Sequence, residues 1–140
     1  MTTLRLPGIE ACVFDAYGTL FDVHAAIGRH RDAVGPDADA FSALWRTKQL
    51  EYTWTNTLAG RYEDFWALTA AALDFCFARM PSVDKTLRSR LLAAYLALDA
   101  YPDAHAVLGD LKAAGQQTAI LSNGSLTMLD SAVSAAKLND

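Results

Sequence analysis

The chain is short of the residues that bind metals or form disulfides. It has two cysteines in 140 residues, Cys12 and Cys76, and neither lies in a CxxC or another metal-ligand spacing. Its three histidines, His24, His30 and His105, lack the i, i+4 pairing of a helical zinc site. We therefore expect two reduced thiols in the core and no bound metal.

Basic clusters and long apolar runs are missing as well. Twelve Lys and Arg against sixteen Asp and Glu give a net charge of −4, and no Lys/Arg run could follow a phosphate backbone, which argues against a nucleic-acid partner. No apolar stretch approaches the roughly 18 residues that a transmembrane helix needs. The opening residues, MTTLRLPGIE, contain no signal-peptide core. We expect a protein that stays in the cytoplasm and has no membrane partner.

Apolar residues are abundant, at 52% of the chain, and fall into two kinds of pattern. Residues 9–14, IEACVF, are almost continuously apolar, which is typical of a strand buried on both faces. Residues 116–124, QQTAILSNG, predict a second strand with a polar tip. Helical patterns, interrupted by glycines and prolines, fill the rest of the chain: 22–34, 37–58, 62–80, 82–100, 102–115 and 125–138.

This order predicts an α/β protein in which a parallel core is interrupted by a four-helix cap. The core comprises residues 1–22 and 100–140, and the cap comprises residues 23–99. Two parallel strands are too few to make a well-covered sheet. We therefore expect the core to be incomplete in this chain, as the N-terminal part of a longer domain.

Polar side chains follow both predicted strands. Asp15 comes directly after the first strand, and Ser122 and Asn123 end the second. The carboxyl ends of parallel neighbours open onto one crevice, where a carboxylate can act as a nucleophile and the neighbouring donors can hold an anion. The alternative is structural, with Asp15 capping a turn and the other two satisfying loop backbone groups. Position alone leaves both interpretations open.

Five segments, taken together and in order, resemble the L-2-haloacid dehalogenases of the haloacid dehalogenase superfamily. They are FDAYGTLFDV (14–23), LWRTKQLEYTW (44–54), RYEDFW (61–66), AYPDA (100–104) and AILSNG (119–124). The resemblance implies a Rossmann-like core of the haloacid dehalogenase type. It also implies hydrolysis of L-2-haloacids to D-2-hydroxy acids through an aspartyl ester, without cofactor or metal.

The resemblance also assigns roles to individual residues. Asp15 matches the nucleophile that displaces the halide, Thr19 the threonine that orients it, and Arg46 the cap arginine that accepts the halide. A guanidinium is a suitable fixed counter-charge where negative charge develops. Arg46 alone would be read as a solvated helix arginine.

The resemblance also implies the positions that bind the substrate. Backbone groups of Ala16 and Tyr17, with Ser122 and Asn123, match the positions that hold the substrate carboxylate. The positions that line the apolar part of the family's pocket match Tyr17, Leu50 and Phe65. The structural alternative for Leu50 and Phe65 is plain helix packing.

Two other functions are to be weighed against this one. A phosphatase of the same superfamily generally carries a second Asp two positions after the nucleophile, where this chain has Tyr17. Loss of that acid is tolerable when a halide leaves but damaging when an alcohol must be protonated. The third possibility is an inactive fragment, because the resemblance implies a lysine and a water-positioning cluster that come after the point where this chain stops. Lys137 comes too early to replace that lysine. Family members commonly form homodimers through the cap, which we expect of the full-length form.

Overall fold

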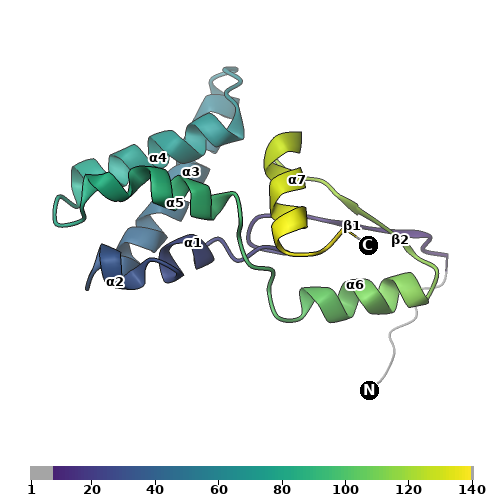
Figure 1. The fold of residues 1–140 in the computed structure, drawn as a ribbon. Helices are drawn as coiled ribbons and strands as arrows, with labels where there is room; N and C mark the ends of the chain where they lie inside the picture. The colour runs from purple at the N-terminus through teal and green to yellow at the C-terminus, as the bar shows by residue number, and fades with distance from the viewer. Residues whose placement is uncertain (1–7, 140) are drawn as a thin grey trace.

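The structure is a computed structural model that describes residues 8–139 (Figure 1). The first half contains β1 (Ala11–Phe14), α1 (Ala25–Gly28), α2 (Arg31–Val34), α3 (Ala38–Leu58) and α4 (Phe65–Arg79). The second half contains a 3-10 helix, η1 (Lys85–Leu87), then α5 (Arg88–Tyr95), α6 (Ala104–Ala113), β2 (Gln117–Ile120) and α7 (Leu126–Ala135). Helices α1 to α5 lie together, whereas β1, β2, α6 and α7 gather beside them (Figure 1).

The helical side is held by aromatic contacts between α3, α4 and α5. The rings of Phe41 and Phe77 lie 5.2 Å apart, and those of Trp45 and Tyr95 lie 5.1 Å apart. Each of these four side chains is at most 3% exposed. Cys76 is fully buried among them, as expected of a core thiol. Burial raises the pKa of that thiol to about 12, which leaves it protonated and unreactive at neutral pH.

The two strands pair in parallel, as predicted. Ala11 lies opposite Gln117 and Phe14 opposite Ile120, so both strands end at the same edge of the sheet. Phe14 turns toward α6, where it lines a small cavity together with Val107 and Leu108.

The expectation that the first strand is buried on both faces is wrong. Val13 is 62% exposed and Ile9 is 44% exposed, while Cys12 is only half-buried. Side chains alternate along a strand, so Ile9 and Val13 share the face opposite Phe14. Within the described residues that face is open, because α6 packs on the Phe14 side.

Two predicted helices are shorter than the sequence pattern indicates. The helix expected over residues 22–34 divides into α1 and α2, since the His30 backbone (φ −118°, ψ 18°) leaves the helical region. The helix expected over residues 82–100 becomes η1 and α5, which ends at Tyr95. The chain beyond Tyr95 instead pairs with the loop after β1, through an antiparallel bridge between Phe21 and Ala100.

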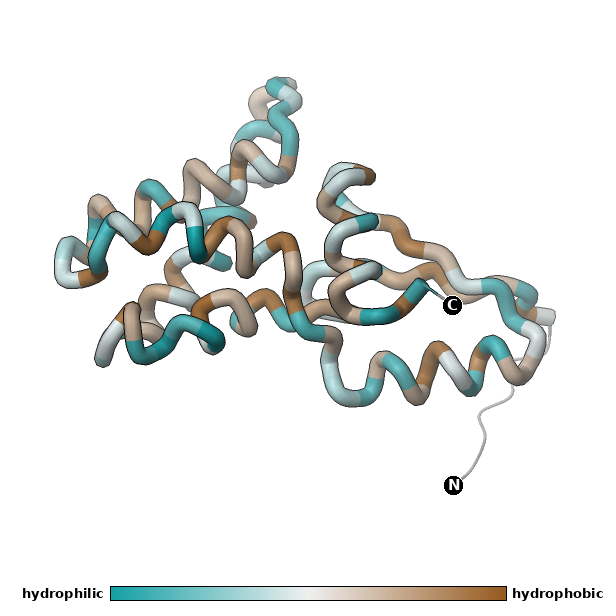
Figure 2. Tube along the Cα trace, viewed as in Figure 1, coloured by the Kyte–Doolittle hydropathy of each residue, from teal (hydrophilic) through white to brown (hydrophobic). Residues whose placement is uncertain are grey.

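The helices carry mixed hydropathy along their lengths (Figure 2). Among residues 8–139, no helix combines the length and the apolar character that a membrane crossing requires.

Candidate functional site

Asp15 stands at the carboxyl end of β1, on a tightly folded loop. Its carboxylate is exposed, and the Thr19 hydroxyl donates a hydrogen bond to its Oδ2 at 3.2 Å. The Ala16 carbonyl accepts the backbone N–H groups of Thr19, Leu20 and Phe21 at 2.9–3.2 Å, which folds the loop back on itself. The loop thus holds Thr19 against Asp15.

The end of β2 brings two more predicted residues to this edge. The Leu121 N–H donates to the Phe14 carbonyl at 2.9 Å, which continues the strand pairing up to the residue before Ser122. Ser122 Oγ accepts the Gly124 N–H at 3.1 Å, so the hydroxyl does satisfy its own loop. Its O–H proton is still available to a ligand.

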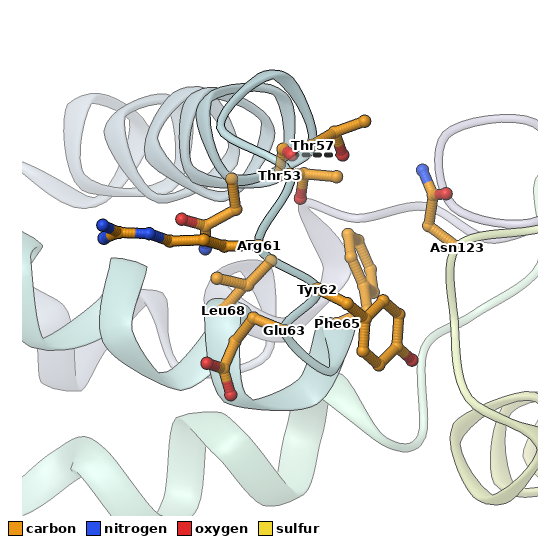
Figure 3. Close-up of a pocket in the computed structure, with 10 residues that line it drawn as sticks. Thr53, Thr57, Arg61, Tyr62, Glu63, Phe65, Leu68 and Asn123 are labelled. Carbon is orange, nitrogen blue, oxygen red and sulfur yellow. Dashed lines mark hydrogen bonds between the residues drawn. The ribbon is translucent and has the colours of Figure 1, made fainter.

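A cavity of about 320 Å³ opens beside Asn123 (Figure 3). Asn123 comes from the loop after β2, whereas the other residues come from the end of α3, the turn that follows and the start of α4 (Figure 3). Phe65 and Leu68 supply apolar surface, and Arg61 and Glu63 supply charge. The cavity therefore lies between the two sides of the molecule, with both polar and apolar lining.

Arg46 reaches from α3 onto the loop that carries Asp15. Its Nη2 donates to the Tyr17 carbonyl at 2.8 Å, and its Nη1 donates to Gln49 Oε1 at 2.9 Å. A Cβ on Gly18 would lie 3.3 Å from Nη2, and Gly18 has a φ of 98°, which L side chains rarely adopt. Glycine at this position lets the loop turn and lets the arginine approach it.

Tyr17 connects the loop to the helical side. Its side chain is 3% exposed, and its ring lies 5.7 Å from Phe65 and 5.7 Å from Tyr95, stacked on the latter at 15°. Within the described residues its hydroxyl is buried without a hydrogen-bond partner. Burial and the neighbouring Tyr95 raise the pKa of Tyr17, so the hydroxyl is un-ionised at any ordinary pH.

The structure brings most of the predicted site residues together and leaves Leu50 apart. Asp15, Ala16, Tyr17 and Thr19 share one loop, and Arg46 contacts it directly. Ser122 and Asn123 follow the strand paired with β1, Phe65 contacts Tyr17, and Phe65 and Asn123 line the same cavity. Leu50 is half-buried on α3 and does not line that cavity.

The sequence interpretation missed a buried polar group behind Arg46. Gln49, on α3, is 1% exposed and contacts Thr69 of α4 and Tyr95 of α5. Its position was a signal, because Phe41, Trp45 and Gln49 recur every four residues on the buried face of α3. An amide in a stripe of core positions requires specific partners.

Possible metal ligands do not gather at this site or elsewhere in residues 8–139, where no group of three His, Cys, Asp or Glu side chains is placed to hold an ion. The Thr19 hydroxyl donates to the Asp15 carboxylate at 3.2 Å. The described arrangement is a carboxylate with hydrogen-bond donors and one guanidinium nearby. Chemically, it suits attack by the carboxylate on a carbon that carries an anionic leaving group.

Comparison with known proteins identifies what the chain is similar to. The pattern of the haloacid dehalogenase-like hydrolases matches residues 9–140. The (S)-2-haloacid dehalogenase 1 of Pseudomonas sp. (strain CBS-3) is 55% identical over 133 residues, which cover 94% of this chain and 59% of that protein. The (S)-2-haloacid dehalogenase 4A of Burkholderia cepacia is 54% identical over 132 residues, covering 94% and 57%.

Solved structures agree with these relatives. A dehalogenase crystal structure superposes with a TM-score of 0.91 at 51% identity, covering 96% of this chain and 60% of that one. The L-2-haloacid dehalogenase from Xanthobacter autotrophicus with chloropropionic acid covalently bound superposes with a TM-score of 0.83 at 41% identity, covering 94% and 54%. The chain thus spans between half and two thirds of the length of these relatives.

Proposed function

Because the chain belongs to the haloacid dehalogenase-like hydrolases, we propose that its site serves the hydrolytic dehalogenation of L-2-haloacids to D-2-hydroxy acids. The observation that carries the proposal is the Asp15 loop, where the Thr19 hydroxyl holds the carboxylate and Arg46 is bound two residues further on. The substrate is a small 2-haloalkanoic acid. The covalent chloropropionic acid complex of the Xanthobacter autotrophicus relative supports an ester intermediate.

The first step forms that ester. An Asp15 carboxylate oxygen attacks C2 of the haloacid from the side opposite the halogen, and the carbon–halogen bond breaks with inversion at C2. The halide leaves with the bonding electron pair, and the Arg46 guanidinium offsets its negative charge. No proton needs to be supplied in this step.

The second step releases the product. Water attacks the carbonyl carbon of the Asp15 ester, and the bond between that carbon and the alkoxide oxygen breaks. The D-2-hydroxy acid leaves with the oxygen that Asp15 contributed, and a water oxygen enters the carboxylate. The balance is one water consumed, with one halide and one proton released.

The neighbouring groups would orient the substrate. We assign the backbone of Ala16 and Tyr17, with Ser122 and Asn123, to the substrate carboxylate. Tyr17, Leu50 and Phe65 are assigned to its alkyl group. A buried Tyr17 ring stands where a phosphatase needs an acid, so the phosphatase alternative is not favoured. The proposed reaction uses no metal and no cofactor.

We extend the proposal to the assembly and location of the full-length form. The full-length form is proposed to be a homodimer in the cytoplasm that binds neither nucleic acid nor membrane. The end of α3 and the turn after it support a cap-mediated dimer, because Trp54, Leu58 and Tyr62 are 60%, 88% and 92% exposed there. We also propose a division into a core of 1–22 and 100–140 and a cap of 23–99, because helices α1 to α5 lie together beside β1, β2, α6 and α7 (Figure 1). Residues 1–7 and 140 of that core lie outside the described residues.

The test is capture of the ester. The full-length product of the gene that encodes this chain, and the 140-residue chain itself, are incubated with L-2-chloropropionate and analysed by intact-protein mass spectrometry. We expect chloride release and D-lactate from the full-length product, and an adduct on Asp15 in the chain if water attack needs groups outside it. Asp15→Asn abolishes both results.

A matched control is Asp22→Asn. The Asp22 carboxylate accepts the His24 backbone N–H at 2.9 Å, so this variant removes an acid on the same segment without touching Asp15. It should retain the adduct. Release of phosphate from phosphate esters with no dehalogenation by the full-length product would overturn the proposal, as would an adduct that persists in Asp15→Asn.

A further inference from the structure

We propose that Gln49 is a positioning residue that fixes the Arg46 guanidinium over the Asp15 loop, with Tyr95 and Thr69 fixing Gln49 in turn. This inference rests on the proposed function, in which Arg46 accepts the halide. Gln49 lies within the 44–54 segment, but the resemblance assigned no role to it.

The guanidinium is held from two sides. Nη2 donates to the Tyr17 carbonyl at 2.8 Å, and Nη1 donates to Gln49 Oε1 at 2.9 Å. The two acceptors come from different parts of the fold, the loop after β1 and α3 itself. Arg46 therefore cannot rotate about its terminal bond without losing one of them, and its remaining N–H groups stay aimed in one direction.

The Gln49 amide has a single satisfactory orientation. Arginine only donates hydrogen bonds, so the amide must present its oxygen to Arg46 and its nitrogen to the other side. Its Nε2 donates to Thr69 Oγ1 at 2.6 Å and to the Tyr95 hydroxyl at 2.9 Å. The Tyr95 hydroxyl also donates back to Gln49 Oε1 at 3.1 Å.

The far end of the group is anchored to backbone. The Thr69 hydroxyl donates to the Phe65 carbonyl at 2.7 Å, which orients its lone pairs toward Gln49. The Thr69 carbonyl accepts the Trp45 indole N–H at 2.9 Å. The chain of donors thus runs in one direction from Arg46 through Gln49 and Thr69 into α4.

Because these residues are buried, the loss of one hydrogen bond would change the position of the others. Gln49 is 1% exposed, Thr69 is fully buried and Tyr95 is 3% exposed, so water cannot replace a lost partner. A leucine would fill the Gln49 position as well as an amide does, but it could not accept from Arg46. A counter-charge for a leaving halide is effective only when it is already in place before the bond breaks.

The experiment compares Gln49→Leu with Thr55→Val in the full-length gene product. Thr55 is exposed on α3 and donates only to carbonyls of its own helix, so it controls for a substitution on that helix. Single-turnover ester formation is followed with L-2-chloropropionate and L-2-bromopropionate. We expect Gln49→Leu to slow the chloride reaction about tenfold to a hundredfold, because a small misplacement of a catalytic group can cost that much, with KM changed little.

Comparing the rate losses with the two substrates distinguishes a misplaced Arg46 from a general loss of structure. Chloride is the poorer leaving group and depends more on Arg46, so the bromide reaction should slow less. Equal losses with both substrates, or a change in KM alone, would overturn the proposal. Thr69→Ser keeps the hydroxyl and should react like wild type, whereas Thr69→Val should follow Gln49→Leu.

A second measurement does not depend on activity. The Arg46 side-chain N–H signals are identified by NMR through their loss in Arg46→Lys, and the rotation rate of the guanidinium is measured. We expect slow rotation in wild type and in Gln49→Glu, which keeps an acceptor for Arg46, and fast rotation in Gln49→Leu. If wild type releases no halide, the proposed function fails, while unchanged rotation in Gln49→Leu refutes the positioning role by itself.

Discussion

Gly124 lies where the loop after β2 packs against the Tyr17 ring, and there is no room for a larger residue at this position. A Cβ on Gly124 would lie 2.7 Å from Tyr17 Cε2, a separation that real Cβ atoms essentially never show. The Tyr17 ring cannot retreat easily, because Phe65 and Tyr95 pack against it. The loop after β2 therefore needs glycine at this position for close packing.

This contact predicts a stability loss for Gly124→Ala. The added methyl group must displace the Tyr17 ring, and overpacking of this kind costs about 1–3 kcal/mol of unfolding free energy. Denaturant unfolding of the full-length gene product measures it. The control is Gly109→Ala within α6, where nothing lies within 4 Å and a gain of about 0.5–1 kcal/mol is expected. A fully stable Gly124→Ala variant would disprove the packing argument.

Among the helices, α4 depends on a side-chain cap at its beginning. The Asp64 carboxylate accepts the Trp66 N–H at 2.8 Å, directly before Phe65 and one turn before Thr69. This cap sets where α4 begins, and hence where Phe65 meets Tyr17. Asp103 holds the same position before α6 without a side-chain cap bond.

The cap should be measurable by substitution. Asp64→Ala removes the acceptor for an otherwise unpaired helical N–H, so we expect a loss of about 1 kcal/mol in unfolding free energy. Asp103→Ala, at the uncapped helix, should lose clearly less. Equal effects of the two substitutions in denaturant unfolding would show that the Asp64 hydrogen bond does not stabilise α4.

Helices α4 and α5 are joined by an ion pair that depends on pH. Arg88 donates to Asp74 through Nε at 2.6 Å and Nη2 at 2.9 Å, and these hydrogen bonds lower the pKa of Asp74. A carboxyl whose pKa is lower in the folded state adds stability above its unfolded pKa. That stability is lost as pH falls through the folded pKa, below roughly pH 4.

Removal of either partner should flatten this acid dependence. Both side chains are about half exposed, at 53% for Asp74 and 43% for Arg88, so solvent screening limits the pair to below about 1 kcal/mol. We expect Asp74→Asn and Arg88→Gln to reduce the slope of unfolding free energy against pH by similar amounts. A wild-type slope in either variant would exclude the pair as its source.

Residue types predicted the elements better than their ends. The apolar run before Asp15 and the polar tip at Ser122 were sufficient to predict two parallel strands that end together. The end of α5 at Tyr95 was not predictable, because residues beyond it pair with Phe21 far earlier in the chain. The buried position of Gln49 on α3 could be predicted from the sequence, but its role could not, because its partners lie on α4 and α5.

At the scale of the whole molecule, one face of the sheet is apolar and open. Ile9 comes just before β1, Val13 lies within it, and Leu121 follows β2. Strand alternation and the pairing register place these three side chains on one face, where they are 44%, 62% and 75% exposed. Sequence periodicity could not reveal this, because burial depends on what covers a sheet. Exposed faces of this kind attract apolar dyes.

We therefore expect the 140-residue chain to bind the dye ANS at this face. A double variant, Val13→Thr with Leu121→Thr, should lower the dye fluorescence by about half, because it removes the two most exposed apolar side chains of that face. Leu58→Thr lies in the exposed group of Trp54, Leu58 and Tyr62 at the end of α3, so it reports dye bound to the helices and should lower the fluorescence less than the double variant does. A larger effect from Leu58→Thr would locate the dye on the helices instead.

The loop after β1 pairs with the segment before α6, and this pairing decides whether the helices between them can be removed. The Asp22 N–H donates to the Asp99 carbonyl and the Tyr101 N–H to the Leu20 carbonyl, each at 2.9 Å. The chain therefore leaves for α1 and returns from α5 at one point. A short turn that joined Asp22 to Asp99 would cost little closure entropy, so we expect that the helices between them could be removed or replaced without stretching the rest of the chain.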